Sequence, residues 1–151
     1  MIREQLKLEN QLCFPVYAAS RLITRIYQPY LDEIGITYPQ YLVLLVLWEK
    51  DEVTVNEISR KLILNTNTTT PLLKRLETLG LVTRRRSGED ERKVIIALTS
   101  KGRKLQSRAA GIPGKLSEGL AAGSMSITDL IDLKDKLHMI IDYLGKEPVK
   151  R

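Results

Sequence analysis

The apolar residues of this chain change their spacing at Gly80, and that change limits its possible folds more than any other feature. Residues 65–79 carry apolar side chains at helical spacing, and a glycine in the next position suits the left-handed residue that ends many helices. After Gly80 the spacing falls to about two residues, which predicts strands at 81–86 and 93–98 joined by the charged loop 87–92. The chain is therefore expected to form a helix that leads directly into an antiparallel hairpin.

Further helices are predicted on both sides of this hairpin. Thr37 and Thr54 each stand three residues before a Gln or Glu, the spacing of a capping box, and predict a helix directly after each. Thr99 and Ser126 predict two more helix starts, and the N-terminal segment also carries apolar residues at helical spacing. The Gly and Pro residues at 111–114 should interrupt the helix that follows Thr99. The predicted fold is mainly α with a small β-hairpin.

A single cysteine, Cys13, and a single histidine, His138, limit the chemistry of the chain. They exclude an intramolecular disulfide framework and cysteine-based zinc sites and leave no cluster for a transition metal, so we expect no cofactor. The longest apolar run, at 41–48, is too short to cross a membrane, and no signal-type segment stands at the N-terminus. These features predict a cytoplasmic protein with no membrane partner.

The formal net charge of +6 is distributed unevenly along the chain. Residues 60–108 hold thirteen Lys and Arg but only four Asp and Glu, so this segment carries +9 and the remainder −3. The segment contains a short helix, a second helix with a polar leading end and a basic hairpin, which is the order of elements in a winged helix-turn-helix lobe. This arrangement favours double-stranded DNA as the partner. The plainer alternative is a solvated charged face on a helical protein.

Specific DNA contacts can be predicted from this arrangement. The polar N-terminus of the second helix offers small donors, acceptors and unpaired N–H groups to base edges and phosphates. Lys74 and Arg75 are expected to hold phosphates, and Arg92, oriented by Asp90 at the hairpin tip, is expected to enter a minor groove. The predicted DNA-binding residues are Asn65, Thr66, Asn67, Thr68, Thr69, Lys74, Arg75, Arg84, Arg86, Asp90 and Arg92.

Two blocks of sequence resemble the MarR family of dimeric bacterial transcription regulators. The first runs from Thr69 to Val82, and the second from Asp90 to Gly102, where Asp-Glu-Arg precedes a strand and Leu-Thr-x-x-Gly follows it. The resemblance implies a single domain over 1–151, with a winged helix-turn-helix lobe at 37–99 and dimerisation helices at 1–36 and 100–151. Because such a homodimer is symmetric, its operator is expected to be pseudo-palindromic.

The N-terminal segment is similar to the one-cysteine, organic-hydroperoxide-sensing OhrR branch of that family. The matching residues are Gln11-Leu12-Cys13-Phe14, followed by Tyr17 and Ser20. In that branch the N-terminal cysteine is the sensor, and its thiolate accepts hydrogen bonds from two tyrosines of the partner subunit. The matching positions are Tyr27 and Tyr38, and Tyr17 matches a further tyrosine of the pocket. The resemblance implies a repressor that releases its operator when an organic hydroperoxide oxidises Cys13.

The chemistry of a lone cysteine agrees with such a role. Peroxides react with the thiolate, which phenol donors and the first turn of a helix both stabilise. Oxidation produces a sulfenic acid, and because the chain has no second cysteine, the next step needs a low-molecular-weight thiol, a backbone nitrogen or more peroxide.

Three alternatives stay open from the sequence alone. In the first, the chain is a regulator of the same family that responds to a small aromatic or phenolic ligand, and Cys13 is a buried hydrophobic residue. In the second, the chain is a thiol peroxidase, although no resolving cysteine or catalytic constellation accompanies Cys13, so we predict that it is not an enzyme. In the third, the winged helix is an adaptor that binds protein.

Overall fold

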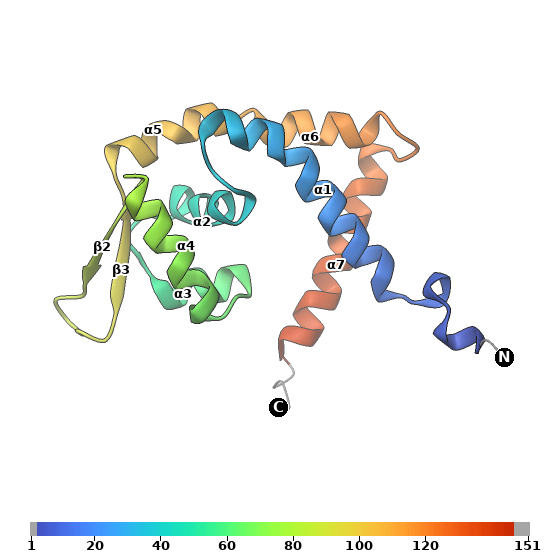
Figure 1. The fold of residues 1–151 in the computed structure, drawn as a ribbon, viewed down its shortest axis with the longest axis horizontal. Helices are drawn as coiled ribbons and strands as arrows, with labels where there is room; N and C mark the ends of the chain where they lie inside the picture. Colours follow the sequence, from blue (N-terminus) through green and yellow to red (C-terminus); the bar gives the residue numbers. More distant parts are fainter. Residues whose placement is uncertain (1–2, 147–151) are drawn as a thin grey trace. The chain divides into compact units, whose positions relative to one another are not determined.

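The computed structural model describes residues 3–146 (Figure 1). Its elements are the 3-10 turns Glu4–Leu6 and Leu8–Asn10, then α1 (Cys13–Ile34), α2 (Tyr38–Glu49), β1 (Val53–Thr54), α3 (Val55–Leu62), α4 (Thr66–Thr78), β2 (Val82–Arg86), β3 (Val94–Leu98), α5 (Ser100–Ala109), α6 (Ile112–Ala121) and α7 (Ile127–Lys146). They form two compact units, Met1–Ala110 and Gly111–Arg151. The prediction of a mainly α fold with a small antiparallel sheet is confirmed.

Each predicted helix start is capped by the expected side chain. The Thr37 and Thr54 hydroxyls accept hydrogen bonds from N–H groups three residues on, at 3.5 and 3.2 Å, and the Gln40 and Glu57 side chains accept the reciprocal bonds at 2.9 and 2.8 Å. Thr99 caps α5 with a bond of 3.0 Å. Ser126 and the acidic residue three positions on form the same reciprocal pair before α7. These caps are local, which is why short sequence patterns located them.

The sheet contains one strand more than the predicted hairpin. Strand order is β1-β3-β2, all antiparallel, with Val82 opposite Leu98 and Val53 opposite Ile96. The extra strand, β1, spans two residues, too few for an alternating pattern to be recognised. Gly80 has a φ of 70°, so the predicted left-handed end of the preceding helix is confirmed.

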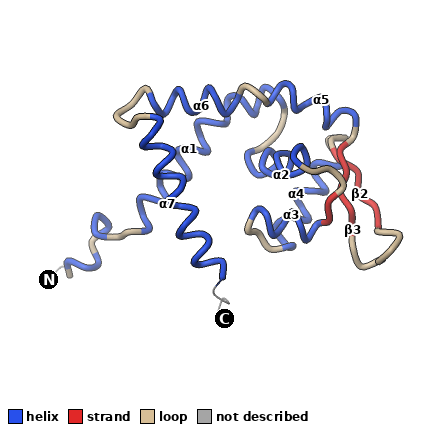
Figure 2. Tube along the Cα trace, turned by 180° about the vertical axis from the view of Figure 1, so that it is seen from behind, coloured by secondary structure: helices blue, strands red, loops and turns tan. Residues whose placement is uncertain are grey.

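The core of the first unit is built around α2. This helix is mostly apolar and buries residues on several faces, so most of its surface packs against its neighbours. The strands lie beside α3 and α4 in Figure 2. Fully buried side chains from five elements meet in this core: Leu31, Leu44, Ile58, Leu73, Leu76 and Ile96. The core therefore holds the two helices of the predicted DNA reader and the base of the hairpin in fixed positions.

The second unit consists of α6 and α7, with a break between α5 and α6 where the sequence predicted an interruption. Pro113 lies in the first turn of α6, where a missing N–H leaves no hydrogen bond unmade. Along α7 many large apolar side chains are exposed, among them Ile131, Met139 and Tyr143. In the described residues, no helix has the length and apolar character needed to span a membrane.

Candidate functional site

The turn between α3 and α4 determines where α4 begins. Ile63 ends α3 with a left-handed φ of 55°, and the N–H of Leu64 donates to the Ser59 carbonyl at 2.9 Å. A β-branched residue in this conformation is strained by about 1–3 kcal/mol, and such strain is concentrated at functional segments. The turn stops α3 abruptly and lets α4 start three residues later with its N-terminus exposed.

The first turn of α4 presents an open polar surface. Asn65 caps the helix through its carboxamide oxygen, which accepts from the N–H of Thr68 at 2.9 Å and from its hydroxyl at 3.2 Å. Thr66 and Asn67 are exposed, and their side chains make no hydrogen bond within the described part of the chain. Because the positive end of the helix dipole lies here, this surface suits an anion and the polar edges of bases.

The structure corrects the prediction that Thr69 reads bases. Its side chain has no exposed surface, accepts a hydrogen bond from the Ser59 hydroxyl at 2.9 Å and donates to the Asn65 carbonyl at 3.1 Å. Thr69 therefore fastens α4 to α3. Farther along α4, Lys74 and Arg75 are exposed, and neither forms a salt bridge within residues 3–146. Both can reach an anion as predicted.

The loop between β2 and β3 extends beyond α3 and α4 (Figures 1 and 2) and is held by its own hydrogen bonds. The Ser87 hydroxyl accepts from the N–H groups of Glu89 and Asp90 at 3.3 and 3.4 Å. The Asp90 carboxylate accepts from the backbone N–H of Arg92 at 3.1 Å. Asp90 therefore shapes the turn, and the Arg92 side chain stays exposed at the tip. Ser87, which the sequence analysis missed, is part of the same turn.

The arginines of β2 have different roles. Arg84 is largely covered, with 23% of its side chain exposed, and its guanidinium lies 3.6 Å from the Glu77 carboxylate of α4. This placement contradicts a free DNA contact by Arg84, which instead joins the sheet to α4. Arg86 is exposed and donates to the Glu91 carbonyl at 3.3 Å, so its remaining donors can reach a phosphate.

Three hydrogen bonds fasten the end of α2 and the turn after it to β3 and to α5, an arrangement that the sequence did not predict. The Trp48 indole donates to the Gly102 carbonyl at 3.0 Å. The Asp51 carboxylate accepts from the N–H of Leu98 at 2.8 Å and from the Arg103 guanidinium at 2.7 Å. Burial alone would raise the pKa of Asp51, but these bonds and one from the Glu52 N–H outweigh it and lower the pKa.

Cys13 is the first residue of α1, and its thiol is exposed. Pro15 lies in the same first turn, where its missing N–H costs no hydrogen bond, so α1 is continuous from Cys13 onward. Tyr17 follows one turn later, also exposed, with the Arg21 guanidinium 5.4 Å from the centre of its ring. The exposed thiol argues against Cys13 as a core residue of its own chain.

Tyr27 and Tyr38 lie together, as the redox hypothesis needs, with ring centres 4.9 Å apart. Tyr41, which the sequence did not single out, completes the cluster at 5.8 Å from Tyr27. Burial, and then the neighbouring phenols of Tyr38 and Tyr41, raise the pKa of Tyr27 to about 12. Burial also raises the pKa of Tyr38. Both phenols therefore keep their protons near neutral pH and can donate hydrogen bonds.

One chain does not bring the cysteine to these phenols. Cys13 and Tyr27 lie on the same helix, about 21 Å apart along its axis at the usual helical rise. Two side chains cannot cover this distance. A contact between Cys13 and the tyrosine cluster therefore requires a second copy of the chain.

Comparison with known proteins gives one family match and close relatives. The family model described as transcriptional regulator SarA/Rot matches residues 25–108. The organic hydroperoxide resistance transcriptional regulator of Bacillus subtilis (strain 168) is 48% identical over 144 residues, which are 95% of this chain and 96% of that protein.

Among solved structures, several forms of AbfR, a protein of Staphylococcus epidermidis, are similar to this chain. Reduced AbfR bound to DNA has a TM-score of 0.76 and 39% identity, covering 96% of this chain and 100% of the other. Overoxidized AbfR bound to DNA has a TM-score of 0.71 and 42% identity, covering 93% and 99%. Disulfide-formed AbfR has a TM-score of 0.66 and 39% identity, covering 95% and 96%.

Proposed function

This chain belongs to the MarR family of transcription regulators, in the branch of the organic hydroperoxide resistance and SarA/Rot regulators, and we propose that it is a homodimeric, redox-controlled repressor. It binds a pseudo-palindromic operator in double-stranded DNA when Cys13 is reduced, and it leaves the operator when an organic hydroperoxide oxidises that thiol. Because its target is DNA and its relatives are regulators, it acts in the cytoplasm and without catalytic turnover.

The observation that carries the DNA proposal is the exposed polar first turn of α4 beside a structured basic hairpin. Bases are read by the exposed side chains of Asn65, Thr66, Asn67 and Thr68. Lys74, Arg75 and Arg86 hold phosphates, and Arg92 enters the minor groove from the loop that Asp90 shapes. AbfR, a relative at 39% identity, has been solved on DNA with the same overall fold, which supports this assignment.

A homodimer completes the thiol site. The phenols of Tyr27 and Tyr38 from a second copy approach Cys13, because one chain keeps these groups about 21 Å apart. The exposed apolar residues of α1, such as Phe14 and Val16, and those of α7 give a second copy a surface to cover. Each phenol donates to the thiolate and stabilises it.

Oxidation removes this arrangement of hydrogen bonds. The Cys13 thiolate attacks the distal oxygen of the hydroperoxide, so that an S–O bond forms, the O–O bond breaks, and the alkoxide takes a proton to leave as an alcohol. A low-molecular-weight thiol then displaces water from the sulfenic acid and forms a mixed disulfide. The larger group separates Cys13 from the phenols and turns the two DNA-binding lobes out of register. A coupling of about 1–3 kcal/mol changes operator affinity 5–150-fold.

The test is an operator titration of the wild type and Cys13→Ser, each reduced, treated with an organic hydroperoxide, and treated with hydroperoxide plus a low-molecular-weight thiol. We expect both proteins to bind equally when reduced and only the wild type to lose affinity after oxidation. If Cys13→Ser also leaves the operator after treatment with hydroperoxide, Cys13 is not the residue whose oxidation releases DNA. Repeated consumption of hydroperoxide without a change in DNA binding would favour a peroxidase instead.

A further inference from the structure

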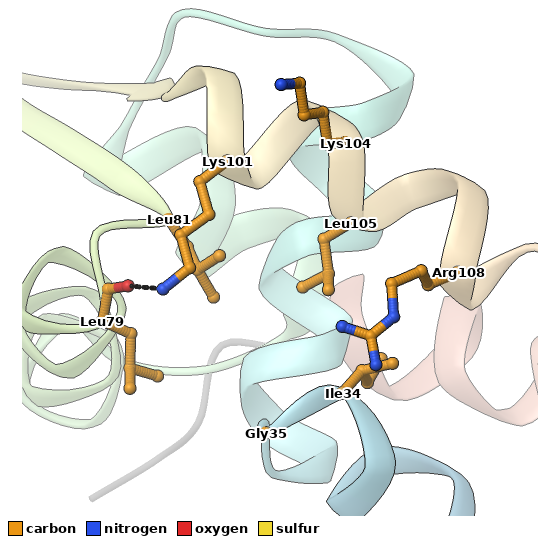
Figure 3. Close-up of a pocket in the computed structure, with 8 residues that line it drawn as sticks. All are labelled: Ile34, Gly35, Leu79, Leu81, Lys101, Lys104, Leu105 and Arg108. Atoms are coloured by element: carbon orange, nitrogen blue, oxygen red, sulfur yellow. Dashed lines mark hydrogen bonds between the residues drawn. The ribbon is translucent and has the colours of Figure 1, made fainter.

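A cavity of about 510 Å³ lies in the first unit, between the C-terminal ends of α1 and α4 and one side of α5, which lines it from Lys101 to Arg108 (Figure 3). Its volume is within the range of about 300–1,000 Å³ that small-molecule sites occupy. None of the residues of the proposed thiol site, Cys13, Tyr27 and Tyr38, lines this cavity. The cavity also lies at the opposite end of α4 from the base-reading turn. The proposed function therefore does not use this cavity.

The floor of the cavity is aliphatic. Leu81 and Leu105 are nearly fully buried, and Ile34 and Leu79 add partly exposed apolar surface. No aromatic ring and no acidic side chain lines it. Branched aliphatic walls without a ring to stack on suit an alkyl chain better than a flat aromatic group.

Three cations of α5, Lys101, Lys104 and Arg108, are among the residues that line the cavity. The Lys101 ammonium donates to the Leu79 carbonyl at 2.8 Å, and the Arg108 guanidinium donates to the Glu33 carbonyl at 2.7 Å. In Figure 3 Leu81 and Leu105 lie between these two groups, while Lys104 points away from them and makes no hydrogen bond within the described chain. One bond uses one of three ammonium donors and one of five guanidinium donors, so donors remain at both ends.

We propose that this cavity binds a medium-chain alkyl carboxylate. The carboxylate takes the free donors of Arg108 or Lys101, and the Lys104 ammonium swings over it, because charge-assisted bonds are the strongest that these groups form. The alkyl chain packs on Leu81 and Leu105, and its apolar surface is removed from water. The two carbonyl bonds already hold Lys101 and Arg108 over the floor, which lowers the entropic cost of binding.

Octanoate is the probe, titrated calorimetrically into the full-length protein. We expect saturable binding at one site per chain, with acetate, which lacks the chain, and octylamine, which reverses the charge, at least about tenfold weaker. Cys13→Ser should bind octanoate as the wild type does, so the result is independent of the proposed redox function. The absence of saturable octanoate binding would overturn the proposal.

Variants locate the site. Lys104→Gln should weaken octanoate binding about threefold, and Lys101→Gln combined with Arg108→Gln about tenfold or more, because each change removes charged donors. Lys134→Gln in α7 makes the same change of charge on an exposed side chain of the second unit and should leave binding unchanged. If the double variant is destabilised by the loss of its two carbonyl bonds, Lys104→Gln alone tests the site, because the Lys104 side chain makes no hydrogen bond to the described chain. Wild-type affinity in Lys104→Gln and in the folded double variant would place octanoate elsewhere and contradict the proposal.

Discussion

At the scale of single residues, burial separates side chains that look alike in the sequence. Thr66 and Thr69 stand three positions apart in one polar stretch, yet Thr66 is exposed and Thr69 is fully buried against Ser59. A hydroxyl inside the fold can stabilise it but cannot reach a base. The two threonines should therefore respond differently to the same substitution.

We expect Thr69→Val to lower the free energy of unfolding by about 1–3 kcal/mol, because the buried Ser59 hydroxyl loses its acceptor and the Asn65 carbonyl loses one of its donors. Urea unfolding measures this change. Thr66→Val is the matched control, since the same substitution at an exposed position should change stability by less than about 0.5 kcal/mol and reduce operator affinity instead. Equal stability of the two variants would show that the Ser59–Thr69 bond contributes little.

Asp51 makes the stability of the fold depend on pH. The pKa of Asp51 in the folded protein lies below the value of 3.8 expected for a free side chain. The charged side chain therefore contributes fully to the free energy of unfolding above pH 3.8, and this contribution is lost as the pH falls through the lower folded pKa. We expect Asp51→Asn to be less stable than the wild type by about 1–3 kcal/mol at pH 7, because it loses a charged acceptor. The difference should shrink as acid is added below pH 4.

Urea midpoints measured between pH 7 and pH 3 test this expectation. Asp142→Asn, at an exposed position of α7, is the control and should follow the wild type at every pH. A constant difference for Asp51→Asn across the series would mean that the charge of Asp51 is not what stabilises the fold.

At the scale of elements, the first turn of α5 is one of the places where the hairpin is attached to the helices. Thr99 donates to the Gly80 carbonyl at 2.6 Å, and Gly102 lies so close to β2 that a Cβ there would overlap the Leu81 carbonyl oxygen. Because that oxygen belongs to the backbone, it cannot move aside as a flexible side chain could. The close packing of α5 against the start of the hairpin therefore requires glycine at position 102.

We expect Gly102→Ala to destabilise the protein by about 2 kcal/mol or more, since either α5 or β2 must shift. Gly119→Ala is the matched control, because a Cβ at Gly119 in α6 meets nothing within 4 Å. It should raise stability by about 0.5–1 kcal/mol through helix propensity. Thermal unfolding of the two variants distinguishes them, and similar melting temperatures would contradict the close packing of α5 on β2.

At the scale of the whole molecule, charge and symmetry determine how the protein meets DNA. The segment 60–108 carries +9, and the proposed homodimer would present this segment twice to one operator. Several phosphate contacts per subunit release counterions, so operator affinity should fall steeply between about 50 and 200 mM salt. Affinity that is independent of salt would contradict phosphate contacts as the main source of binding.

We expect Arg92→Ala to weaken operator binding by about 1–3 kcal/mol and to reduce the slope of log affinity against log salt by about one for each subunit's lost contact. Unfolding free energy should not change, because the Arg92 side chain is exposed and the turn is held by its backbone N–H. Lys134→Ala, outside the basic segment, should leave both affinity and slope unchanged. An unchanged slope for Arg92→Ala would place the arginine away from the DNA.

The sequence by itself determined the starts of the helices capped by Thr37, Thr54, Thr99 and Ser126, the two long strands and the place of the positive charge. Helix caps such as Thr37 and Thr54 depend on residues within a few positions of each other, and so does the change of apolar spacing at Gly80. Such local patterns can be recognised without knowing the fold. The family followed from motifs of the same local kind.

Only the tertiary structure decided which polar side chains are available. Thr69 and Arg84 are covered by α3 and α4, Tyr41 joins Tyr27, and Cys13 stays apart from both tyrosines that were predicted to serve it. The physical reason is the same in each case: exposure and side-chain contact depend on segments that are distant in the sequence. For Cys13 the structure keeps the thiol away from Tyr27 of its own chain, as the expected contact with the partner subunit requires, because a helix keeps its residues at fixed separations.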